Sequence, residues 1–321
     1  MRVMDDAERA VEQTRRLRGE AWFETALTIE PERSGLTVDG HDLELLTWGE
    51  RGRPGLLFCH GLAASADWWR FIAPHYACSF RVAAFSWGGT GRSDWRKTYS
   101  IERCIREYQA IMDAAGLFDG GKPAVIGHSF GGFPLLRGAA QDSEGWSAII
   151  LADTNVPRLD VGPQPAQRQF KSNLTFVTVE ESVAKFRLMP DPPRRNPQIV
   201  EFLARAAVSP IRGSWGWRSD PDFYANFEYG PGTDRLEAHC PVTLLYGEHS
   251  SLLTASRLDR ARQMLRAPDV HFIKIADSGH HMLVDQPEAV IGEIDKALAR
   301  VGLYPEAGQK SGIASPILDN G

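Results

Sequence analysis

Short apolar runs alternate with helical patterns over most of this 321-residue chain. Each run is three to six residues long with turn residues around it, which is typical of buried strands. The alternation predicts an α/β fold: a mostly parallel sheet with helices on both faces. The predicted strands are 56–59, 80–85, 124–126, 148–151, 242–246 and 270–275, and the predicted helices are 68–75, 101–115, 130–141, 255–265 and 287–301.

Particular residues mark the ends of some of the predicted helices and strands. Ser100 can cap the helix that begins after it, and Gly116 can end that helix. Pro287 fits the first position of the final helix. Upstream, residues 36–38 and 41–48 flank Asp39-Gly40, which predicts a β-hairpin that enters the core. A mostly polar helix over 4–18 is expected within an N-terminal extension that comprises residues 1–34.

The α/β pattern is interrupted between residues 155 and 236. This stretch is rich in proline and aromatic residues. A structureless loop of that length is improbable in a compact domain, so the stretch is interpreted as an inserted, mainly helical cap. The core then comprises residues 35–154 and 237–303. The last stretch, 304–321, is rich in glycine, proline and serine and is expected to be disordered.

Composition narrows the class of function. With 36 basic and 41 acidic residues the net charge is -5, which argues against binding nucleic acid or an anionic membrane and favours a small-molecule substrate. The four cysteines lack metal-ligand spacing, and no metal or other cofactor is expected. The N-terminus has acidic residues where a signal peptide is apolar, and no apolar run reaches about 18 residues, so a cytoplasmic protein is expected.

The chemistry centres on Gly127-His128-Ser129-Phe130-Gly131, which follows an apolar strand and precedes a helix. This is the pattern of a nucleophile elbow, in which a strained turn presents the serine hydroxyl outside the sheet. His60-Gly61 ends an earlier strand, and Gly279-His280 follows the last one. In this order, and with the glycine-rich turn 89–93, residues 35–303 resemble the α/β-hydrolase superfamily, the serine-nucleophile branch with a cap domain.

The resemblance implies a role for each motif. Ser129 would be the nucleophile, and His280 the base that removes its proton, with His281 as the alternative. The backbone N–H groups of Leu62 and Phe130 would form the oxyanion hole.

The sequence departs from the family pattern at the third catalytic residue. The family usually has an aspartate three or four residues after Gly247, but serines, Ser250 and Ser251, occupy both positions. Some members place the acid after the strand that follows the elbow helix, which favours Asp153. Glu248 is the second candidate, and another carboxylate such as Asp277, or no acid at all, completes the alternatives.

A second departure follows the strand 80–85. The family commonly has an aspartate and an arginine where this chain has Ser86 and Gly88. These two differences are expected to change the packing beside the oxyanion hole more than the catalytic chemistry. Three nearby tryptophans are candidates either for the acyl side of a pocket or for the plain core: Trp68, Trp69 and Trp87.

A serine at the elbow argues against epoxide hydrolases and haloalkane dehalogenases, which resemble this fold but use aspartate there. The aromatic insertion favours a small, largely hydrophobic ester or lactone, as for a carboxylesterase. One alternative is carbon-carbon bond hydrolysis of a diketone-like acid, and another is ligand binding without turnover, which the missing acid motivates. The carbon-carbon hydrolase would need a cation for the substrate carboxylate, for which the candidates are Arg194, Arg195, Arg205, Arg212 and Arg218.

Overall fold

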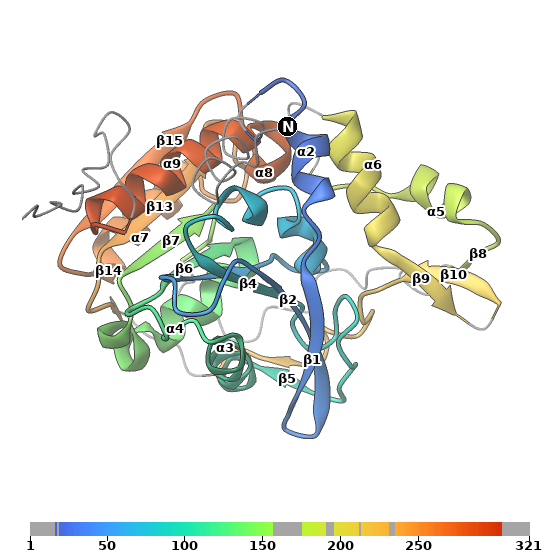
Figure 1. Ribbon diagram of the computed structural model, residues 1–321, viewed down its shortest axis with the longest axis horizontal. Coiled ribbons are helices and arrows are strands. Elements are labelled where there is room, and N and C mark those ends of the chain that lie inside the picture. Colours follow the sequence, from blue (N-terminus) through green and yellow to red (C-terminus); the bar gives the residue numbers. More distant parts are fainter. Residues whose placement is uncertain are drawn as a thin grey trace, which may run out of the picture.

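An eight-stranded sheet forms the centre of the computed structural model (Figure 1), which describes Leu17 and residues 19–156, 175–190, 196–211, 213–230 and 235–303. The strand order is β1-β2-β4-β3-β6-β7-β13-β15, with parallel pairing from β4 onwards and antiparallel pairing of β2 with both β1 and β4. The prediction of a mostly parallel sheet is confirmed. The strands are β1 Glu32–Val38, β2 His41–Trp48, β3 Gly55–Cys59, β4 Arg81–Phe85, β6 Ala124–His128, β7 Ala148–Ala152, β13 Val242–Gly247 and β15 Val270–Ile275.

The predicted hairpin is formed by β1 and β2. Val38 pairs with His41, so the connection is Asp39 and Gly40. Both residues have positive φ, 51° and 75°, as a two-residue turn between twisted strands requires. The predicted helix 4–18 lies, except for Leu17, outside the described residues, and so does the tail 304–321.

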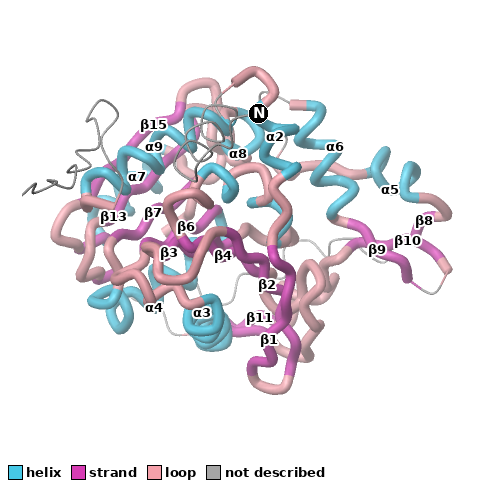
Figure 2. The backbone as a smooth tube through the Cα atoms, viewed as in Figure 1, coloured by secondary structure: helices cyan, strands magenta, loops and turns pink. Residues whose placement is uncertain are grey.

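Helices cover both faces of the sheet (Figure 2), and side chains from successive strand positions enter two separate cores. In β3, Phe58 packs into the core beneath α2 and α9, whereas Leu57 packs into the core beneath α3, α4 and α7. The helices are α2 Trp22–Thr28, α3 Ile101–Ala115, α4 Gly132–Asp142, α7 Ala255–Met264, α8 Met282–Asp285 and α9 Pro287–Arg300. This two-sided burial explains why the strands read as continuous apolar runs.

The predicted helix boundaries are confirmed where a local signal marked them. The Ser100 hydroxyl accepts a hydrogen bond from the Arg103 N–H, and Gly116 ends α3 with φ 69°. Pro287 is the first residue of α9. The segment 68–75, predicted as one helix, forms two short 3-10 helices, Ala66–Trp69 and Ala73–His75. Pro74 accounts for the break, because it has no N–H to donate to a preceding turn.

The described part of the insertion contains two helices, α5 Val179–Lys185 and α6 Pro197–Ala206. It also contains a three-stranded antiparallel sheet of β8 Thr175–Phe176, β10 Ser214–Trp217 and β9 Val208–Ile211, beside α5 in Figure 1. Strands this short, one of them an edge strand with a proline, have no alternating pattern that sequence could reveal. The predicted domain boundaries stay predictions.

The chain leaves the insertion through a segment that is bound to the glycine-rich turn of the core. Gly91 N–H donates to the Arg218 carbonyl, and Asp220 N–H donates to the Gly89 carbonyl, each at 2.8 Å. Thr90 and Ser219 form a β-bridge between these bonds. Arg218 is therefore fixed relative to the sheet by its backbone. Two further short pairs complete the fold: β5 Tyr99–Ser100 with β11 Phe227–Glu228, and β12 Leu236–Glu237 with β14 Leu265–Arg266.

Three of the four cysteines pack in the interior, and Cys78 is half-buried. Cys59, Cys104 and Cys240 are buried in the core beneath α3 and α4, and the described residues contain no disulfide. None of the helices in the described part of the chain has the length and the apolar run that crossing a bilayer requires. The cytoplasmic location stays a prediction.

Candidate active site

Ser129 lies on a sharp turn between β6 and α4. The strand ends at His128, a 3-10 turn covers Ser129–Gly131, and α4 follows at once. Ser129 has φ 52°, a conformation that only a strained turn imposes on a serine. A Cβ on Gly127 would lie 2.5 Å from the Gly132 Cα, and one on Gly131 would lie 2.3 Å from the Cys59 carbonyl oxygen. The two elbow glycines are therefore required by close backbone contacts.

Asp153 and His280 lie together at the carboxyl end of the sheet. His280 Nδ1 is 2.7 Å from Asp153 Oδ2, and both residues are buried. Because a carboxylate can only accept, Nδ1 carries the proton, which leaves Nε2 of a neutral His280 as a proton acceptor. Sequence placed Asp153 first among four alternatives, and the structure brings this carboxylate to His280.

Ser250, at one of the positions where the family usually has its acid, contacts the same carboxylate. Its hydroxyl donates to Asp153 Oδ2 at 2.6 Å, and Gly247 N–H donates to Oδ1 at 3.3 Å. Asp153 thus accepts three hydrogen bonds, which fix the orientation of its carboxylate. Asp153 follows the end of β7, and the loop after β13 supplies a donor to its carboxylate.

The other candidates lie elsewhere. Glu248 is exposed, and its Oε1 is 2.6 Å from Lys274 Nζ; this hydrogen bond lowers the pKa of the Glu248 carboxyl. Asp277 is exposed, and its N–H donates to Glu248. His281 is buried with its ring 5.8 Å from that of Trp68, whereas the hydrogen bond to Asp153 belongs to His280. These three residues are not brought together with Asp153.

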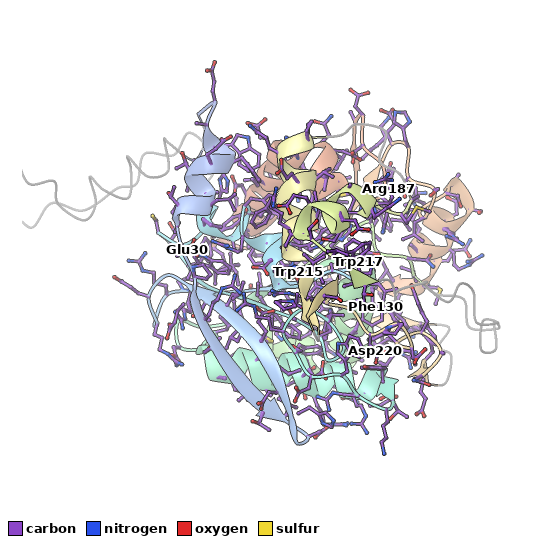
Figure 3. The ribbon with its side chains drawn as sticks, turned by 90° about the vertical axis from the view of Figure 1, so that its right-hand side faces the viewer. Glu30, Phe130, Arg187, Trp215, Trp217 and Asp220 are labelled. Atoms are coloured by element: carbon purple, nitrogen blue, oxygen red, sulfur yellow. The ribbon has the colours of Figure 1, made fainter. Side chains whose placement is uncertain are left out.

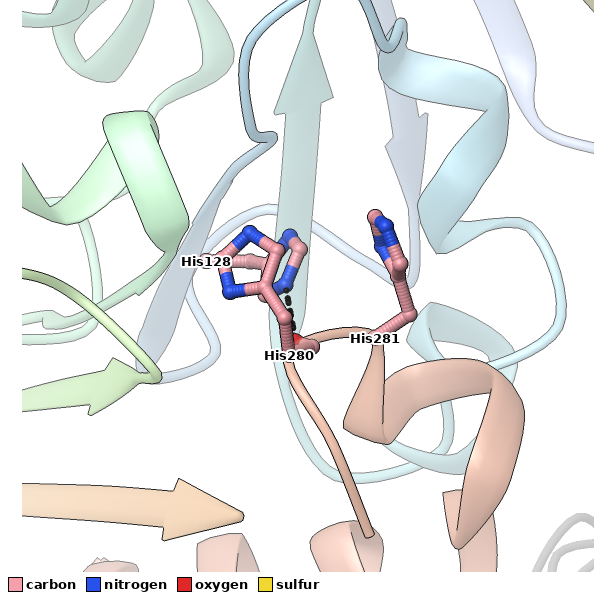
Figure 4. A group of neighbouring side chains, drawn as sticks. All are labelled: His128, His280 and His281. Atoms are coloured by element: carbon pink, nitrogen blue, oxygen red, sulfur yellow. Dashed lines mark hydrogen bonds between the residues drawn. The ribbon is translucent and has the colours of Figure 1, made fainter. Parts of the chain in front are cut away.

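His128, to which sequence reasoning gave no role, supports the histidine loop. Its Nε2–H donates to the His280 carbonyl at 3.0 Å, the bond drawn in Figure 4, and its ring stacks on Trp68 at 6.1 Å between centroids. Burial, and then the neighbouring His280 and His281, lowers the pKa of His128 well below its usual value. A neutral His128 thus links the elbow to the backbone of His280. In the sequence, only the position of His128 directly before Ser129 could have indicated this role.

Leu62 and Phe130 border the nucleophile from two adjacent strands. Phe130 directly follows Ser129, and Leu62 follows Gly61 in the loop after β3, which pairs with β6. A Cβ on Gly61 would lie 3.2 Å from the Cβ of Ser129, so this loop passes directly against the elbow. The backbone N–H groups proposed for an oxyanion hole therefore come from segments on either side of the serine.

The departures at Ser86 and Gly88 are compensated by other residues. The Ser86 hydroxyl donates to Glu44 Oε2 at 2.8 Å and accepts from Ala66 N–H at 3.0 Å. A Cβ on Gly88 would lie 2.7 Å from Arg96 Nε, whose guanidinium forms a buried 3.0 Å ion pair with Glu107. A carboxylate and an arginine are thus present beside this segment, although they come from β2 and from the loop before β5.

His60 holds the segment after β4 in place as a neutral imidazole. Its Nδ1–H donates to the Gly61 carbonyl at 2.6 Å, and its Nε2 accepts from Trp87 N–H at 3.1 Å. Burial lowers the pKa of His60 to about 4. Both ring nitrogens of His60 form hydrogen bonds. Protonation of Nε2 would place a second donor against the Trp87 N–H, which already donates to this nitrogen.

This geometry predicts that acid destabilises the protein through His60. Its pKa is about 4 when folded and about 6.5 when unfolded, so the unfolded state binds the proton first and the free energy of unfolding falls as pH decreases below about 6.5. Between pH 7 and pH 5 we expect His60 to account for a loss of about 2 kcal/mol, measured by urea unfolding. His60→Gln should reduce this loss, whereas exposed His249→Gln should not. An unchanged loss in His60→Gln would contradict the assignment.

A cavity of about 280 Å³ lies beside the loop that follows Leu62, and Ser129 and His280 are not among the residues that line it. Its wall includes Ala63, which follows Leu62, and Trp68, which stacks on His128. The insertion supplies the facing wall, and Figure 3 shows two of its residues, Trp217 and Arg187, on the same side of the molecule as Phe130. Of the tryptophans weighed from sequence, Trp68 lines the cavity, and Trp69 and Trp87 belong to the core.

Three imidazoles also meet here. The ligating atoms of His128, His280 and His281 lie within 4.8 Å of one another, and the group is buried (Figure 4). Imidazole nitrogens bind zinc and similar ions, so this group could hold one. Because His280 Nδ1 already binds Asp153, such an ion would occupy Nε2, the nitrogen that would otherwise accept a proton. The residues come from distant parts of the sequence, so spacing could not predict the group.

Comparisons with known proteins show which relatives and folds this chain resembles. Lipase LipV of Mycobacterium tuberculosis is 30% identical over 115 residues, 36% of this chain and 42% of the lipase. Epoxide hydrolase A of the same organism is 22% identical over 84% of this chain and 96% of its own. A thermophilic esterase structure from Thermogutta terrifontis superposes with a TM-score of 0.63 at 22% identity, covering 84% of this chain and 99% of that one, which shows a shared fold.

The sequence profile of the alpha/beta hydrolase family matches residues 56–293, which include the elbow, Asp153 and His280. This match spans most of the core as well as the insertion. The strand order and the position of the serine turn agree with it. The chain therefore belongs to the alpha/beta hydrolase family.

Proposed function

We propose that this protein is a serine hydrolase that cleaves a carboxylic ester or lactone of a small, largely hydrophobic substrate. The observation that carries the proposal is the buried 2.7 Å hydrogen bond between His280 and Asp153, at the same sheet edge as the elbow serine Ser129. A nucleophile, a base and a carboxylate that orients the base are the groups that acyl transfer needs.

The reaction would proceed through an acyl-enzyme. Ser129 Oγ attacks the carbonyl carbon while His280 Nε2 takes its proton, and Asp153 stabilises the imidazolium that forms. The tetrahedral intermediate collapses, and His280 returns the proton to the leaving alcohol. Water then attacks the acyl-enzyme in the same way, releasing the acid and restoring Ser129. In a lactone the leaving alcohol stays attached to the acyl chain.

Negative charge on the carbonyl oxygen would be stabilised by the N–H groups of Leu62 and Phe130. Both belong to backbone segments that the elbow fixes, so they require little reorganisation during the reaction. Losing one such donor typically costs about a hundredfold or more in rate. Since these are backbone groups, changing the side chains would test them poorly.

The lining of the cavity supports the substrate class. Trp68, Phe186, Met189 and Trp217 give it apolar walls, and a volume of about 280 Å³ is at the small end for ligand pockets. A serine at the elbow sets this chain apart from the epoxide hydrolases that it resembles, because those use aspartate there. The hydrogen bond between Asp153 and His280 argues against ligand binding without turnover, because that alternative was motivated by the missing acid after Gly247.

Carbon-carbon bond hydrolysis of a diketone-like acid is the second candidate. It needs a cation near the reacting centre, and Arg218 lines the cavity. Of the other arginines considered, Arg205 forms ion pairs with Glu201 and Glu180, and Arg194, Arg195 and Arg212 lie outside the described residues.

A fluorophosphonate probe tests the proposal, because it reacts with activated serines. We expect stoichiometric labelling at neutral pH, with the added mass on the peptide that contains Ser129, and hydrolysis of at least one member of a p-nitrophenyl ester panel. Heat-unfolded protein, in which His280 no longer adjoins the serine, is the control and should not be labelled. Labelling at another residue, or none together with no hydrolysis, would reject the proposal.

A further inference from the structure

The wall that the insertion contributes to the cavity carries unbalanced positive charge. Lys185, Arg187 and Arg218 line it, together with one acidic residue, Asp220. The Asp220 carboxylate is already engaged: Oδ2 accepts from the Tyr99 hydroxyl, and Oδ1 accepts from the Asp222 N–H at 2.9 Å. It is therefore bound to other groups and does not form an ion pair with the three cations.

The cations themselves lack carboxylate partners within the described part of the chain. None of the ion pairs found there includes Lys185, Arg187 or Arg218. The Arg187 guanidinium donates only to backbone carbonyls, those of Ala184 and Phe186. Lys185 and Arg187 are exposed, whereas Arg218 is half-buried. Since a half-enclosed cation costs free energy unless an anion accompanies it, Arg218 favours a negatively charged ligand, and the two exposed cations add to the positive charge around it.

Of the three cations, Arg218 is the one whose position is fixed by hydrogen bonds. Its N–H donates to the Ala207 carbonyl at 2.8 Å, its own carbonyl accepts from Gly91, and its Nε donates to the Val208 carbonyl at 2.7 Å. Burial, and then Arg92, lowers the pKa of Arg218, whereas the carboxylates of Asp67 and Glu44 act in the opposite direction without forming an ion pair with it; a guanidinium remains charged at neutral pH. A fixed, half-buried guanidinium is suited to bind a carboxylate through paired hydrogen bonds.

The opposite wall consists of residues next to those that contact the elbow, and neither Ser129 nor His280 is among the residues that line the cavity. Ala63 and Ala64 continue the chain from Leu62, and Trp68 stacks on the His128 ring. A small molecule could therefore place a carbonyl at Ser129 and an acidic group against the insertion.

We infer that the substrate carries a carboxylate in addition to its scissile ester or lactone bond, and that Arg218, assisted by Arg187 and Lys185, binds this carboxylate. This inference rests on the proposed function and narrows its substrate class. The apolar side chains would hold the hydrocarbon between the two polar ends, and the cations would fix which end faces Ser129.

A pair of esters that differ only in charge tests the inference: 4-acetoxybenzoate and its neutral methyl ester, with release of the phenol followed at neutral pH. We expect the wild-type protein to prefer the carboxylate by about tenfold or more in kcat/KM, with a preference that shrinks as salt is added. Arg218→Gln and Arg187→Gln should each reduce the ratio. Arg205→Gln, an exposed and ion-paired residue of the same insertion, should leave it unchanged.

The outcomes separate this inference from the proposed function. If the neutral ester is cleaved as well as the acid, or if Arg205→Gln lowers the ratio as much as Arg218→Gln, the carboxylate site is refuted while serine hydrolysis stands. If neither ester is cleaved, calorimetric titration of Ser129→Ala with 4-acetoxybenzoate decides. Binding about tenfold tighter than that of the methyl ester supports the site, and equal binding refutes it.

Discussion

Ser129→Ala is expected to lower kcat by at least about 10⁴-fold on any ester that the wild-type protein hydrolyses. The change removes only the hydroxyl oxygen, on a half-buried residue whose φ of 52° is set by the elbow glycines. The backbone donors and the His280–Asp153 pair stay in place. What remains is a site that can bind a substrate and stabilise an oxyanion but has no nucleophile.

The measurement is steady-state hydrolysis of the best p-nitrophenyl ester, with circular dichroism and the melting temperature to establish that the variant folds. Ser251→Ala is the matched control, because Ser251 is an exposed serine in the loop after β13. It should retain the wild-type rate. A Ser129→Ala protein that keeps a tenth or more of the activity would place the nucleophile elsewhere.

Much of this site could be predicted because its constraints are local. Gly127 and Gly131 are needed wherever a strand, a serine turn and a helix pack so closely, so the elbow has a sequence signature. The hairpin turn and the caps of α3 are recognised for the same reason. The alternation of apolar runs with helical patterns predicted the sheet, and the order of the elbow, His60-Gly61 and Gly279-His280 along the chain then indicated the family.

The carboxylate that contacts His280 was harder to predict because its position depends on strand order. Asp153 and Ser250 are 97 residues apart, and they meet because β7 and β13 are neighbours in the sheet. Likewise, Glu44 reaches Ser86, and Arg96 fills the space beside Gly88, through contacts between segments that are far apart in sequence. A single sequence shows that a usual residue is missing but not which distant residue replaces it.

The positively charged wall of the cavity was equally hard to predict from the sequence. Arg218 was one of five arginines considered, and nothing in its spacing distinguished it. The sequence did not single out Lys185 or Arg187, because the packing of a short helix end in a proline-rich insertion cannot be inferred from sequence. The three cations line one cavity because the insertion folds over the loop after β3.

Asp153→Asn is expected to lower kcat by about 10⁴-fold, whereas Glu248→Gln should change it by less than about twofold. The asparagine removes the charge that stabilises the protonated His280. It also brings an amide NH₂ to a place where the Ser250 hydroxyl and the Gly247 N–H already donate, so a correctly oriented acceptor for His280 Nδ1 is lost. Glu248 is exposed and bound to Lys274, so neutralising it affects the surface alone. The opposite ranking would reject Asp153 as the acid.

The double variant Asp153→Asn/Ser250→Asp distinguishes loss of the charge from damage to the fold. In the wild-type structure the Ser250 hydroxyl is 2.6 Å from the same Asp153 oxygen that lies 2.7 Å from His280 Nδ1. A carboxylate introduced at residue 250 therefore starts within reach of the histidine, at a position where the family usually has its acid. We expect it to recover at least about tenfold of the lost rate, corresponding to about 1.4 kcal/mol of activation free energy. If Asp153→Asn is folded and Ser250→Asp recovers nothing, the carboxylate must act only from the end of β7, with the geometry that Asp153 alone provides.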